Sequence, residues 1–174
     1  MRIVFLDVDG PLTYSEYENE ETAGIDPEKV KLLKEICDKT SSKVVIISSW
    51  RGGRDYTPRI YHVLIDVLTK YGVEVIGDAP YIDSVIEGEV PNPCTFEDIA
   101  KIKIKHGTGR AAEVQQWLNE HPDTESFVIL DDEDFGWADY GYEKHWVRPT
   151  WFGNGGLKQV HVDNAIKILY NNIS

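Results

Sequence analysis

The chain has 174 residues, of which 41% are hydrophobic and 28% are charged, and its formal net charge is −12 at pH 7. This composition favours one globular domain with a core of ordinary size. No apolar run is long enough to span a membrane. The negative charge argues against a general nucleic-acid binder, because phosphate contacts need Lys and Arg. The N-terminus enters strand-like sequence directly, so we expect no secretory signal and a cytoplasmic location.

The first element is a short apolar run that ends in two acidic residues. Ile3–Leu6 contains β-branched and aromatic residues, which predicts a buried strand. Asp7 and Asp9 follow it, and then comes Gly10. Ionised carboxylates in an apolar setting are costly unless they are paired or bound to a metal. Taken alone, the two acids are equally compatible with a solvated turn.

Short apolar strands and amphipathic helices alternate along the chain. The expected strands cover residues 3–6, 44–47, 73–76, 127–130 and 143–147. The expected helices begin at Pro27 with Asp26 as N-cap, after Thr57-Pro58, at Gly109 and near Val160. This alternation predicts an α/β fold, in which a mainly parallel central sheet carries helices on both faces as a three-layer sandwich.

Two segments interrupt the alternation, and we expect them to be small insertions in a single domain over residues 1–174. The first is an acidic loop at about 11–25, and the second covers about 77–108 and contains several prolines. Within the second, Lys101, Lys103 and Lys105 alternate with isoleucines. As a strand of a hairpin or flap, this stretch would place three lysines on one face.

Polar residues follow three of the predicted strands where each strand ends. They are Asp7 and Asp9 after the first strand, Ser48 and Ser49 after the second, and Asp131, Asp132 and Asp134 after the fourth. Because ligands bind beyond the carboxyl ends of strands in open parallel sheets, we expect these residues to form one site.

The predicted cluster suits phosphoryl transfer. Converging carboxylates with no His or Cys among them favour a hard divalent cation, best Mg²⁺. One Asp can act as a nucleophile toward phosphorus, and a second can protonate the leaving oxygen and then activate water. A Ser hydroxyl and a cationic side chain can hold the phosphoryl oxygens.

Four motifs in order resemble those of the haloacid-dehalogenase (HAD) superfamily of phosphatases. They are Asp7-Val8-Asp9-Gly10, Ser49-Trp50-Arg51, Arg110 at a helix start, and Ile129-Leu130-Asp131-Asp132. The resemblance covers about residues 1–135 and implies a Rossmannoid core with a minimal cap. The Ser-Ser-Trp-Arg stretch and the helix from Arg110 to Leu118 are most similar to the HAD domains of RNA-repair proteins and polynucleotide kinase-phosphatases.

The resemblance implies a role for each acid. Asp7 would be the nucleophile and a Mg²⁺ ligand. Asp9 would be the general acid and base, and its backbone carbonyl would also ligate the metal. Asp131 and Asp132 would supply the remaining metal coordination, with Asp132 slightly favoured as the direct ligand.

The same resemblance implies that Ser49 and Arg110 bind the phosphoryl group. Ser48 is an alternative to Ser49, because both residues lie at the strand end. Lys105 is an alternative to Arg110. We favour Arg110, because the free N–H groups of a helix start also attract phosphate.

The remaining candidates lie near these motifs. Arg51 is either a contact of the substrate phosphate, which we favour, or a salt-bridge partner of Asp134. The tryptophans expected to pack in the core or over the sheet end, rather than stack on a base, are Trp117, Trp137, Trp146 and Trp151.

We therefore expect a Mg²⁺-dependent phosphomonoester hydrolase, with the 3′-phosphate ends of DNA or RNA as a candidate substrate class and no membrane partner. A small-molecule or nucleotide phosphatase is the first alternative, favoured by the acidic charge. A receiver-like signalling domain or a silent binding module is the second, and Asp9 argues against it, because receivers lack an acid two residues beyond the phospho-acceptor. The oligomeric state stays open.

Overall fold

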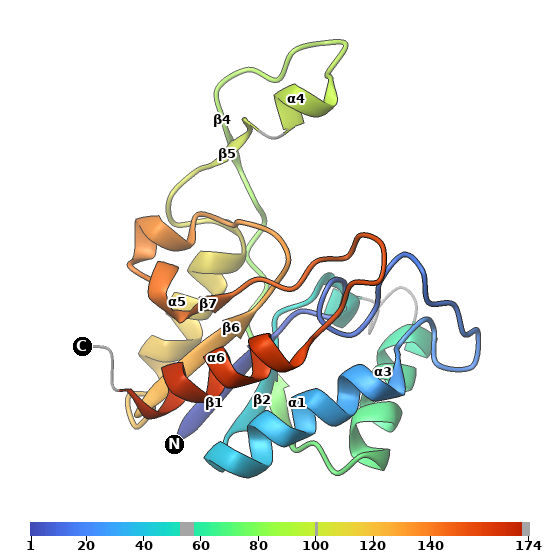
Figure 1. Cartoon of the computed structure of the whole chain (residues 1–174). Helices are drawn as coiled ribbons and strands as arrows, with labels where there is room; N and C mark the ends of the chain where they lie inside the picture. Colours follow the sequence, from blue (N-terminus) through green and yellow to red (C-terminus); the bar gives the residue numbers. More distant parts are fainter. Residues whose placement is uncertain (53–57, 100, 172–174) are drawn as a thin grey trace.

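The computed structural model describes residues 1–52, 58–99 and 101–171. Its centre is a five-stranded sheet in the order β3-β2-β1-β6-β7, and every neighbouring pair of strands is parallel (Figure 1). The strands are β1 (Arg2–Leu6), β2 (Lys43–Ile46), β3 (Val75–Asp78), β6 (Ser126–Leu130) and β7 (Trp146–Val147). The predicted parallel α/β sheet is confirmed.

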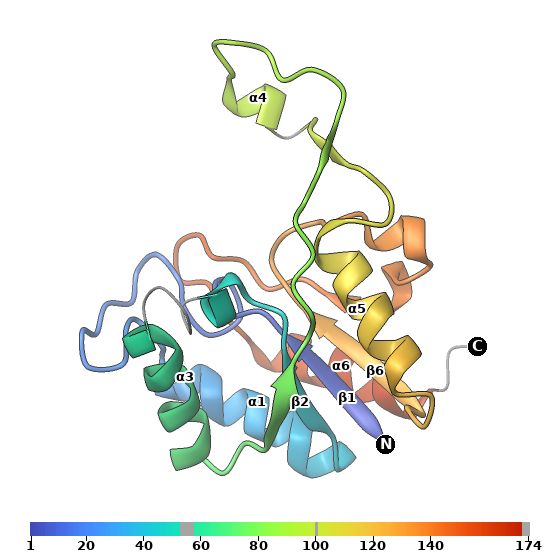
Figure 2. The same cartoon turned by 180° about the vertical axis from the view of Figure 1, so that it is seen from behind.

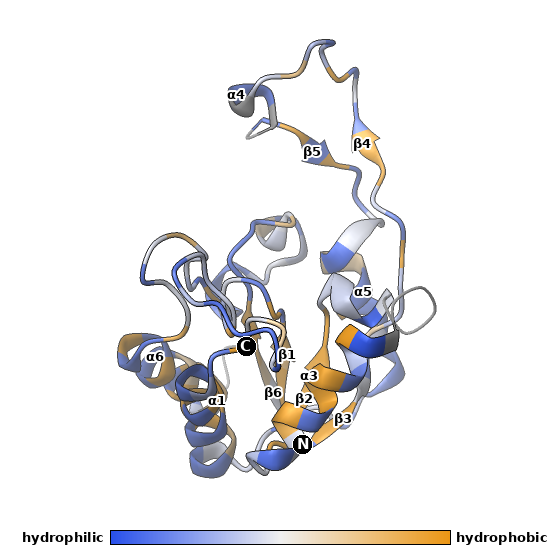
Figure 3. Cartoon of the chain, turned by 90° about the vertical axis from the view of Figure 1, so that its right-hand side faces the viewer, coloured by the Kyte–Doolittle hydropathy of each residue, from blue (hydrophilic) through white to orange (hydrophobic). Residues whose placement is uncertain are grey.

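Helices cover both faces of this sheet. The four long ones are α1 (Pro27–Thr40), α3 (Pro58–Lys70), α5 (Gly109–Glu120) and α6 (Gln159–Tyr170). Figure 3 shows α1 and α6 on one side of the strands and α5 on the other, which makes the predicted three-layer sandwich. Among the described helices, none has both the length and the apolarity needed to cross a membrane.

Side-chain alternation along β1 divides the core into two halves. Val4 and Leu6 face a cluster shared with α1, α3 and α6, whereas Ile3 and Phe5 face a cluster shared with α5. Phe5 meets Trp117 of α5 edge to face, with ring centroids 5.3 Å apart. Fully burying each such side chain contributes roughly 1.5–3 kcal/mol, so β1 is held firmly from both sides.

Helix α1 begins where the sequence predicts. Asp26 is its N-cap, and its side chain accepts a hydrogen bond from the backbone N–H of Glu28 at 2.9 Å. Pro27 is the first helical residue, where its missing N–H would have had no partner within the helix. The apolar residues Val30, Leu33 and Ile36 recur at helical spacing and are all buried.

Two predicted strands differ from the observed ones. The third strand begins at Val75 rather than Val73, because the N–H of Val73 bonds to Leu68 O at 3.0 Å and closes the end of α3. The predicted strand over 143–147 is wrong in its first part. Residues Glu143–His145 form a 3₁₀ turn (η3), and two residues of β7 pair with β6.

The second predicted insertion forms an arm that stands away from the sheet (Figures 1 and 2). It carries strands β4 (Ile86–Glu87) and β5 (Lys103–Ile104), which pair antiparallel, and a short helix, α4 (Phe96–Ile99). The strand predicted over 101–105 is therefore shorter than expected. Its alternation is present, since the three lysines are exposed and the two isoleucines are half-buried.

Candidate active site

The predicted site residues meet beyond the carboxyl ends of β1, β2 and β6. The chain leaves β1 toward β2 on one side, while β6 pairs with β1 on the other, so the sheet has a topological switch point there. A cavity of about 420 Å³ opens at this place. Its lining residues are Asp7, Asp9, Ser49, Arg110, Asp132, Glu133, Trp151 and Phe152.

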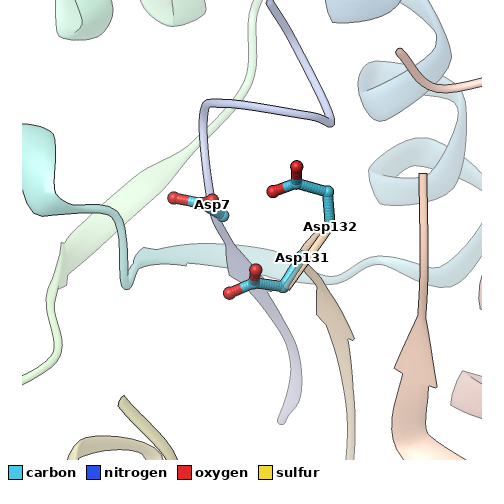
Figure 4. Close-up of side chains that lie close together, drawn as sticks. All are labelled: Asp7, Asp131 and Asp132. Carbon is cyan, nitrogen blue, oxygen red and sulfur yellow. The ribbon is translucent and has the colours of Figure 1, made fainter. Parts of the chain in front are cut away.

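Three carboxyl groups gather at this place, and two of them, those of Asp7 and Asp132, line the cavity. Asp7, Asp131 and Asp132 each offer an oxygen atom, and these atoms all lie within 4.8 Å of one another (Figure 4). Asp7 continues β1, and its N–H donates to Leu130 O at 2.9 Å, so the backbone register places it beside the end of β6. An oxygen-only group of this kind is compatible with Mg²⁺.

The two neighbouring acids after β6 have different surroundings. Asp131 is fully buried, and protein donors engage both of its oxygens: Arg110 Nη1 at 2.6 Å and the N–H of Glu133 at 3.0 Å. Asp132 is half-buried and lines the cavity. Of these two acids, Asp132 is the one that lines the cavity, and its role as the direct metal ligand stays a prediction.

Arg110 supplies the positive charge in this group of acids. Arg110 is the second residue of α5. It follows Gly109, whose φ of +74° turns the chain into the helix. Its Nη1 lies 3.2 Å from an oxygen of Asp7 and 2.6 Å from one of Asp131. Burial lowers the pKa of Arg110, but the two carboxylates more than offset this and raise it, so the guanidinium stays charged. Lys105, the alternative, is exposed on the arm.

Burial disfavours the ionised form of Asp7, Asp131 and Asp132. It raises the pKa of Asp7, while Arg110 and the Ser48 hydroxyl oppose this rise. Burial also raises the pKa of Asp131, and the Arg110 guanidinium opposes this rise. Asp132 has its pKa raised to about 6, first by burial and then by the charges of Asp7 and Glu133. A bound cation would relieve this electrostatic stress.

Asp9 is held through both of its carboxylate oxygens. Thr13 Oγ1 donates to one oxygen at 2.7 Å, and the indole Nε1 of Trp50 donates to the other at 2.9 Å. Sequence reasoning did not assign a function to either donor. A signal was available for Trp50, because a half-buried indole N–H at a strand end needs an acceptor and Asp9 was expected at the same edge.

The two serines after β2 have separate positions. Ser48 is fully buried, and its hydroxyl hydrogen-bonds the carboxyl group of Asp7. Ser49 begins the 3₁₀ turn η1 (Ser49–Gly52), is exposed, and lines the cavity. The structure thus places Ser49 where a phosphoryl group could reach it and Ser48 behind the nucleophile candidate.

Arg51 has a different partner from the one that the sequence suggested. Its guanidinium forms a buried ion pair with Glu113 of α5, not with Asp134, and also donates to Ile46 O at 3.4 Å. The other carboxylate oxygen of Glu113 accepts from the N–H of Ile82 at 2.9 Å, at the base of the arm. Arg51 also lines a cavity of about 70 Å³ that shares Ser49 and Arg110 with the larger one, so contact with a substrate stays a prediction.

Gly10 is required by the closeness of Asp132. A Cβ atom at this position would lie 2.4 Å from Cβ of Asp132, and its φ of +88° is one that L residues rarely adopt. The glycine of the first motif therefore lets the loop after β1 approach the acid that follows β6.

The aromatic residues near the site behave differently from one another. Trp117 and Trp137 are buried as expected, and Trp146 is half-buried, with its indole N–H donating to Asp131 O at 2.8 Å. Trp151 lies at the cavity beyond the carboxyl ends of the strands and is only partly packed. It is 39% exposed and lines the cavity together with Phe152, which sequence reasoning did not consider.

A profile of known families gives one match. The family described as "HAD domain in Swiss Army Knife RNA repair proteins" matches residues 3–162. A comparison with curated proteins gives no match, and neither does a comparison with solved structures. The matched stretch includes every residue that lines the cavity.

Proposed function

The chain belongs to the family of HAD domains found in Swiss Army Knife RNA repair proteins, and from this premise we propose that it is a Mg²⁺-dependent phosphomonoester hydrolase that uses Asp7 as its nucleophile. The family supports phosphatase-type hydrolysis in general terms. The observation that carries the finer proposal is that one cavity is lined by the residues we propose as nucleophile, acid/base, phosphate-binding hydroxyl and guanidinium, and metal ligand: Asp7, Asp9, Ser49, Arg110 and Asp132.

In the first proposed step, an oxygen of Asp7 attacks phosphorus, and the bond from phosphorus to the leaving oxygen breaks. Asp9 gives its proton to that oxygen, so the leaving group departs as an alcohol. Ser49 and Arg110 hold the phosphoryl oxygens during the transfer. The product is an acyl phosphate on Asp7.

In the second step, Asp9 takes a proton from a water molecule, which attacks the phosphorus of the acyl phosphate. The bond between phosphorus and Asp7 breaks, and the carboxylate of Asp7 is restored with release of inorganic phosphate. Asp9 serves first as acid and then as base, and the Trp50 and Thr13 donors keep its carboxyl group pointed at the cavity.

The donor atoms fit the cation that HAD domains generally use. Asp7 and Asp132 would hold Mg²⁺ through carboxylate oxygens, with the backbone carbonyl of Asp9 as a further ligand, while Asp131 keeps Arg110 in place. When bound, Mg²⁺ neutralises charge on the phosphoryl oxygens and the acids around them.

We propose a nucleic-acid 3′-phosphate end as the substrate class. The family description names RNA repair, and the arm stands away from the body instead of folding as a lid over it (Figure 1). Lys101, Lys103 and Lys105 are exposed on this arm and could contact backbone phosphates. A small-molecule phosphatase is the second candidate, favoured by the net charge of −12, which repels polyanions.

Hydrolysis assays separate the two candidates. We expect Mg²⁺-dependent release of phosphate from a 3′-phosphorylated oligonucleotide with a higher kcat/KM than from free nucleotides or sugar phosphates. Asp7→Asn should abolish turnover of every substrate, because an amide cannot form the acyl phosphate. Full Mg²⁺-dependent activity in Asp7→Asn would contradict the mechanism, and faster hydrolysis of the small phosphates would favour the second candidate.

A further inference from the structure

Trp151 and Phe152 form an exposed aromatic pair at the candidate active-site cavity. Phe152 is 76% exposed, the largest fraction among the large hydrophobic side chains that the structure describes, and Trp151 is 39% exposed. Both line the cavity that contains Asp7 and Arg110. Exposed apolar area of this size contributes nothing to folding, and beside a ligand cavity it indicates a contact surface.

Hydrogen bonds within the protein hold the loop that carries this pair. Trp151 O accepts from the N–H of Ser15 at 2.8 Å, and the N–H of Gly153 donates to Ser15 Oγ at 2.8 Å. The N–H of Gly156 donates to Thr150 O at 2.9 Å and closes the loop behind the pair. The two rings meet edge to face, with centroids 5.8 Å apart. A prearranged aromatic surface loses little entropy on binding.

The charged side chains at the cavity favour different ligand groups at different points of it. Arg110 attracts the phosphate at the base of the cavity, whereas Glu133 lines it and Glu16 lies beside the loop of the aromatic pair, 3.7 Å from where a Cβ of Gly153 would be. Carboxylates at the rim disfavour a second phosphate there. A neutral, flat group suits the rim better, and aromatic rings stack on nucleobases without preference for one base.

The cavity has room for such a group. Its volume is about 420 Å³, and at roughly 30 Å³ per water molecule a phosphoryl group and its metal fill only part of it. The total volume lies within the range of sites that hold small organic ligands, roughly 300–1,000 Å³.

We propose that Trp151 and Phe152 form a stacking platform for the base of the terminal nucleotide whose 3′-phosphate lies between Asp7 and Arg110. Because the two rings are nearly perpendicular, the base stacks on the face of one ring and contacts the other ring along its edge. This inference rests on the proposed phosphatase function and adds a base-binding subsite to it. The platform recognises any nucleobase by its flat face, so it distinguishes a nucleotide end from a phosphate on a bare sugar.

The test compares two 3′-phosphorylated oligonucleotides of one sequence, of which one ends in a normal nucleotide and the other in an abasic sugar. We expect Phe152→Ala and Trp151→Ala to raise KM for the normal end about tenfold or more, the effect of losing a stacking contact worth roughly 1–3 kcal/mol per base. The kcat for that end and both constants for the abasic end should change less than about twofold. Phe152→Tyr, which keeps the ring, should behave like the wild type.

The outcomes are distinct from a failure of the proposed function. If the wild type hydrolyses both ends and Phe152→Ala raises KM equally for both, or for neither, the platform is wrong and the phosphatase stands. If no phosphomonoester is hydrolysed, the phosphatase proposal fails, and equilibrium binding then tests the platform. In Asp7→Asn, the normal end should quench tryptophan fluorescence more than the abasic end, and Trp151→Phe should remove the difference. Equal quenching by both ends would overturn the proposal.

A third substrate distinguishes the end of a strand from a free nucleotide. A nucleoside 3′-monophosphate presents the same base and phosphate without the rest of the chain. The platform predicts the same tenfold KM effect of Phe152→Ala on this nucleotide as on the oligonucleotide. An effect on the oligonucleotide alone would contradict base stacking, because the pair would then contact another part of the strand.

Discussion

At the residue scale, the site depends on donors that orient its acids. Both oxygens of Asp9 are held, by Thr13 at 2.7 Å and by Trp50 at 2.9 Å, so its carboxyl group has little rotational freedom. A proton donor must lie within hydrogen-bond reach of the leaving oxygen in a fixed direction. We therefore infer that Trp50 positions Asp9, the proposed acid/base, through its indole N–H.

Trp50→Phe tests this positioning, because it keeps a ring and removes the N–H donor. A hydrogen bond to a charged group contributes roughly 1.5–3 kcal/mol, so we expect kcat to fall about tenfold to a hundredfold on an alkyl phosphomonoester. The fall should be smaller on nitrophenyl phosphate, whose leaving group needs less help from an acid. Steady-state kinetics on both substrates measures the difference.

Thr13→Ser serves as the matched control, because it keeps the hydroxyl that donates to Asp9. It should retain near wild-type kcat, whereas Thr13→Val should show the same dependence on the leaving group as Trp50→Phe. An equal loss on both phosphate esters would contradict the positioning role and indicate general distortion.

At the element scale, a buried ion pair joins the parts of the fold that carry the site. Arg51 belongs to η1, which also presents Ser49, and Glu113 belongs to α5, which also presents Arg110. Glu113 additionally holds the base of the arm through the N–H of Ile82. The pair therefore connects the turn, the helix and the arm at one point, next to the residues proposed to bind phosphate.

Glu113→Gln should destabilise the protein strongly, because it leaves the Arg51 charge buried and unpaired. Breaking a buried pair costs roughly 3–5 kcal/mol, and replacing both partners with apolar groups is often nearly neutral. We expect urea denaturation to show a loss in this range for Glu113→Gln. The double substitution Arg51→Met with Glu113→Leu should lose less than the single one.

An exposed pair on α1 provides the comparison. Glu28 and Lys31 interact at the surface, so Glu28→Gln should change the free energy of unfolding by about 1 kcal/mol or less. A loss in Glu113→Gln as small as that in Glu28→Gln would show that the buried pair does not hold the elements together.

At the scale of the whole molecule, the sheet concentrates negative charge at one edge of an already acidic protein. The parallel strands bring Asp7, Asp131 and Asp132 together, and burial raises the pKa of each. An acid whose pKa is higher in the folded state than in the unfolded state favours folding at low pH, and this contribution is lost as the pH rises through the folded pKa. Without a cation, the site opposes folding near neutral pH.

The prediction concerns Asp132, whose pKa is raised to about 6 against roughly 3.9 in an unfolded chain. In the presence of EDTA at pH 7.5, Asp132→Asn should melt at a higher temperature than the wild type, by roughly 2–4 °C for each kcal/mol of relieved repulsion. The difference should shrink as the pH falls from 7 toward 4, because Asp132 becomes protonated. Thermal melts at several pH values measure it.

Added Mg²⁺ should reverse the order. A ligand at a hundred times its Kd stabilises the folded state by about 2.7 kcal/mol, and the wild type should gain this while Asp132→Asn gains little. Asp123→Asn changes an exposed acid far from the site. It should melt at the same temperature as the wild type, both with EDTA and with added Mg²⁺. Equal stabilisation of the wild type and Asp132→Asn by Mg²⁺ would contradict the role of Asp132 as a ligand.

The sequence alone determined the fold class and which acids meet. Apolar strands alternating with amphipathic helices specify a parallel sheet, and a parallel sheet places the residues that follow β1, β2 and β6 at one edge. Asp7, Ser49 and Asp132 could be identified in this way, because strand direction and sequence position are sufficient to locate them.

Only the tertiary structure decided which side chains face each other across that edge. The partner of Arg51 is Glu113 on a distant helix, one partner of Asp9 is the indole of Trp50, and Trp151 is 39% exposed where it lines the cavity. These contacts depend on the relative placement of elements far apart in the chain. Local periodicity specifies the face of an element but not the group it meets, because that group is selected by packing of the whole fold.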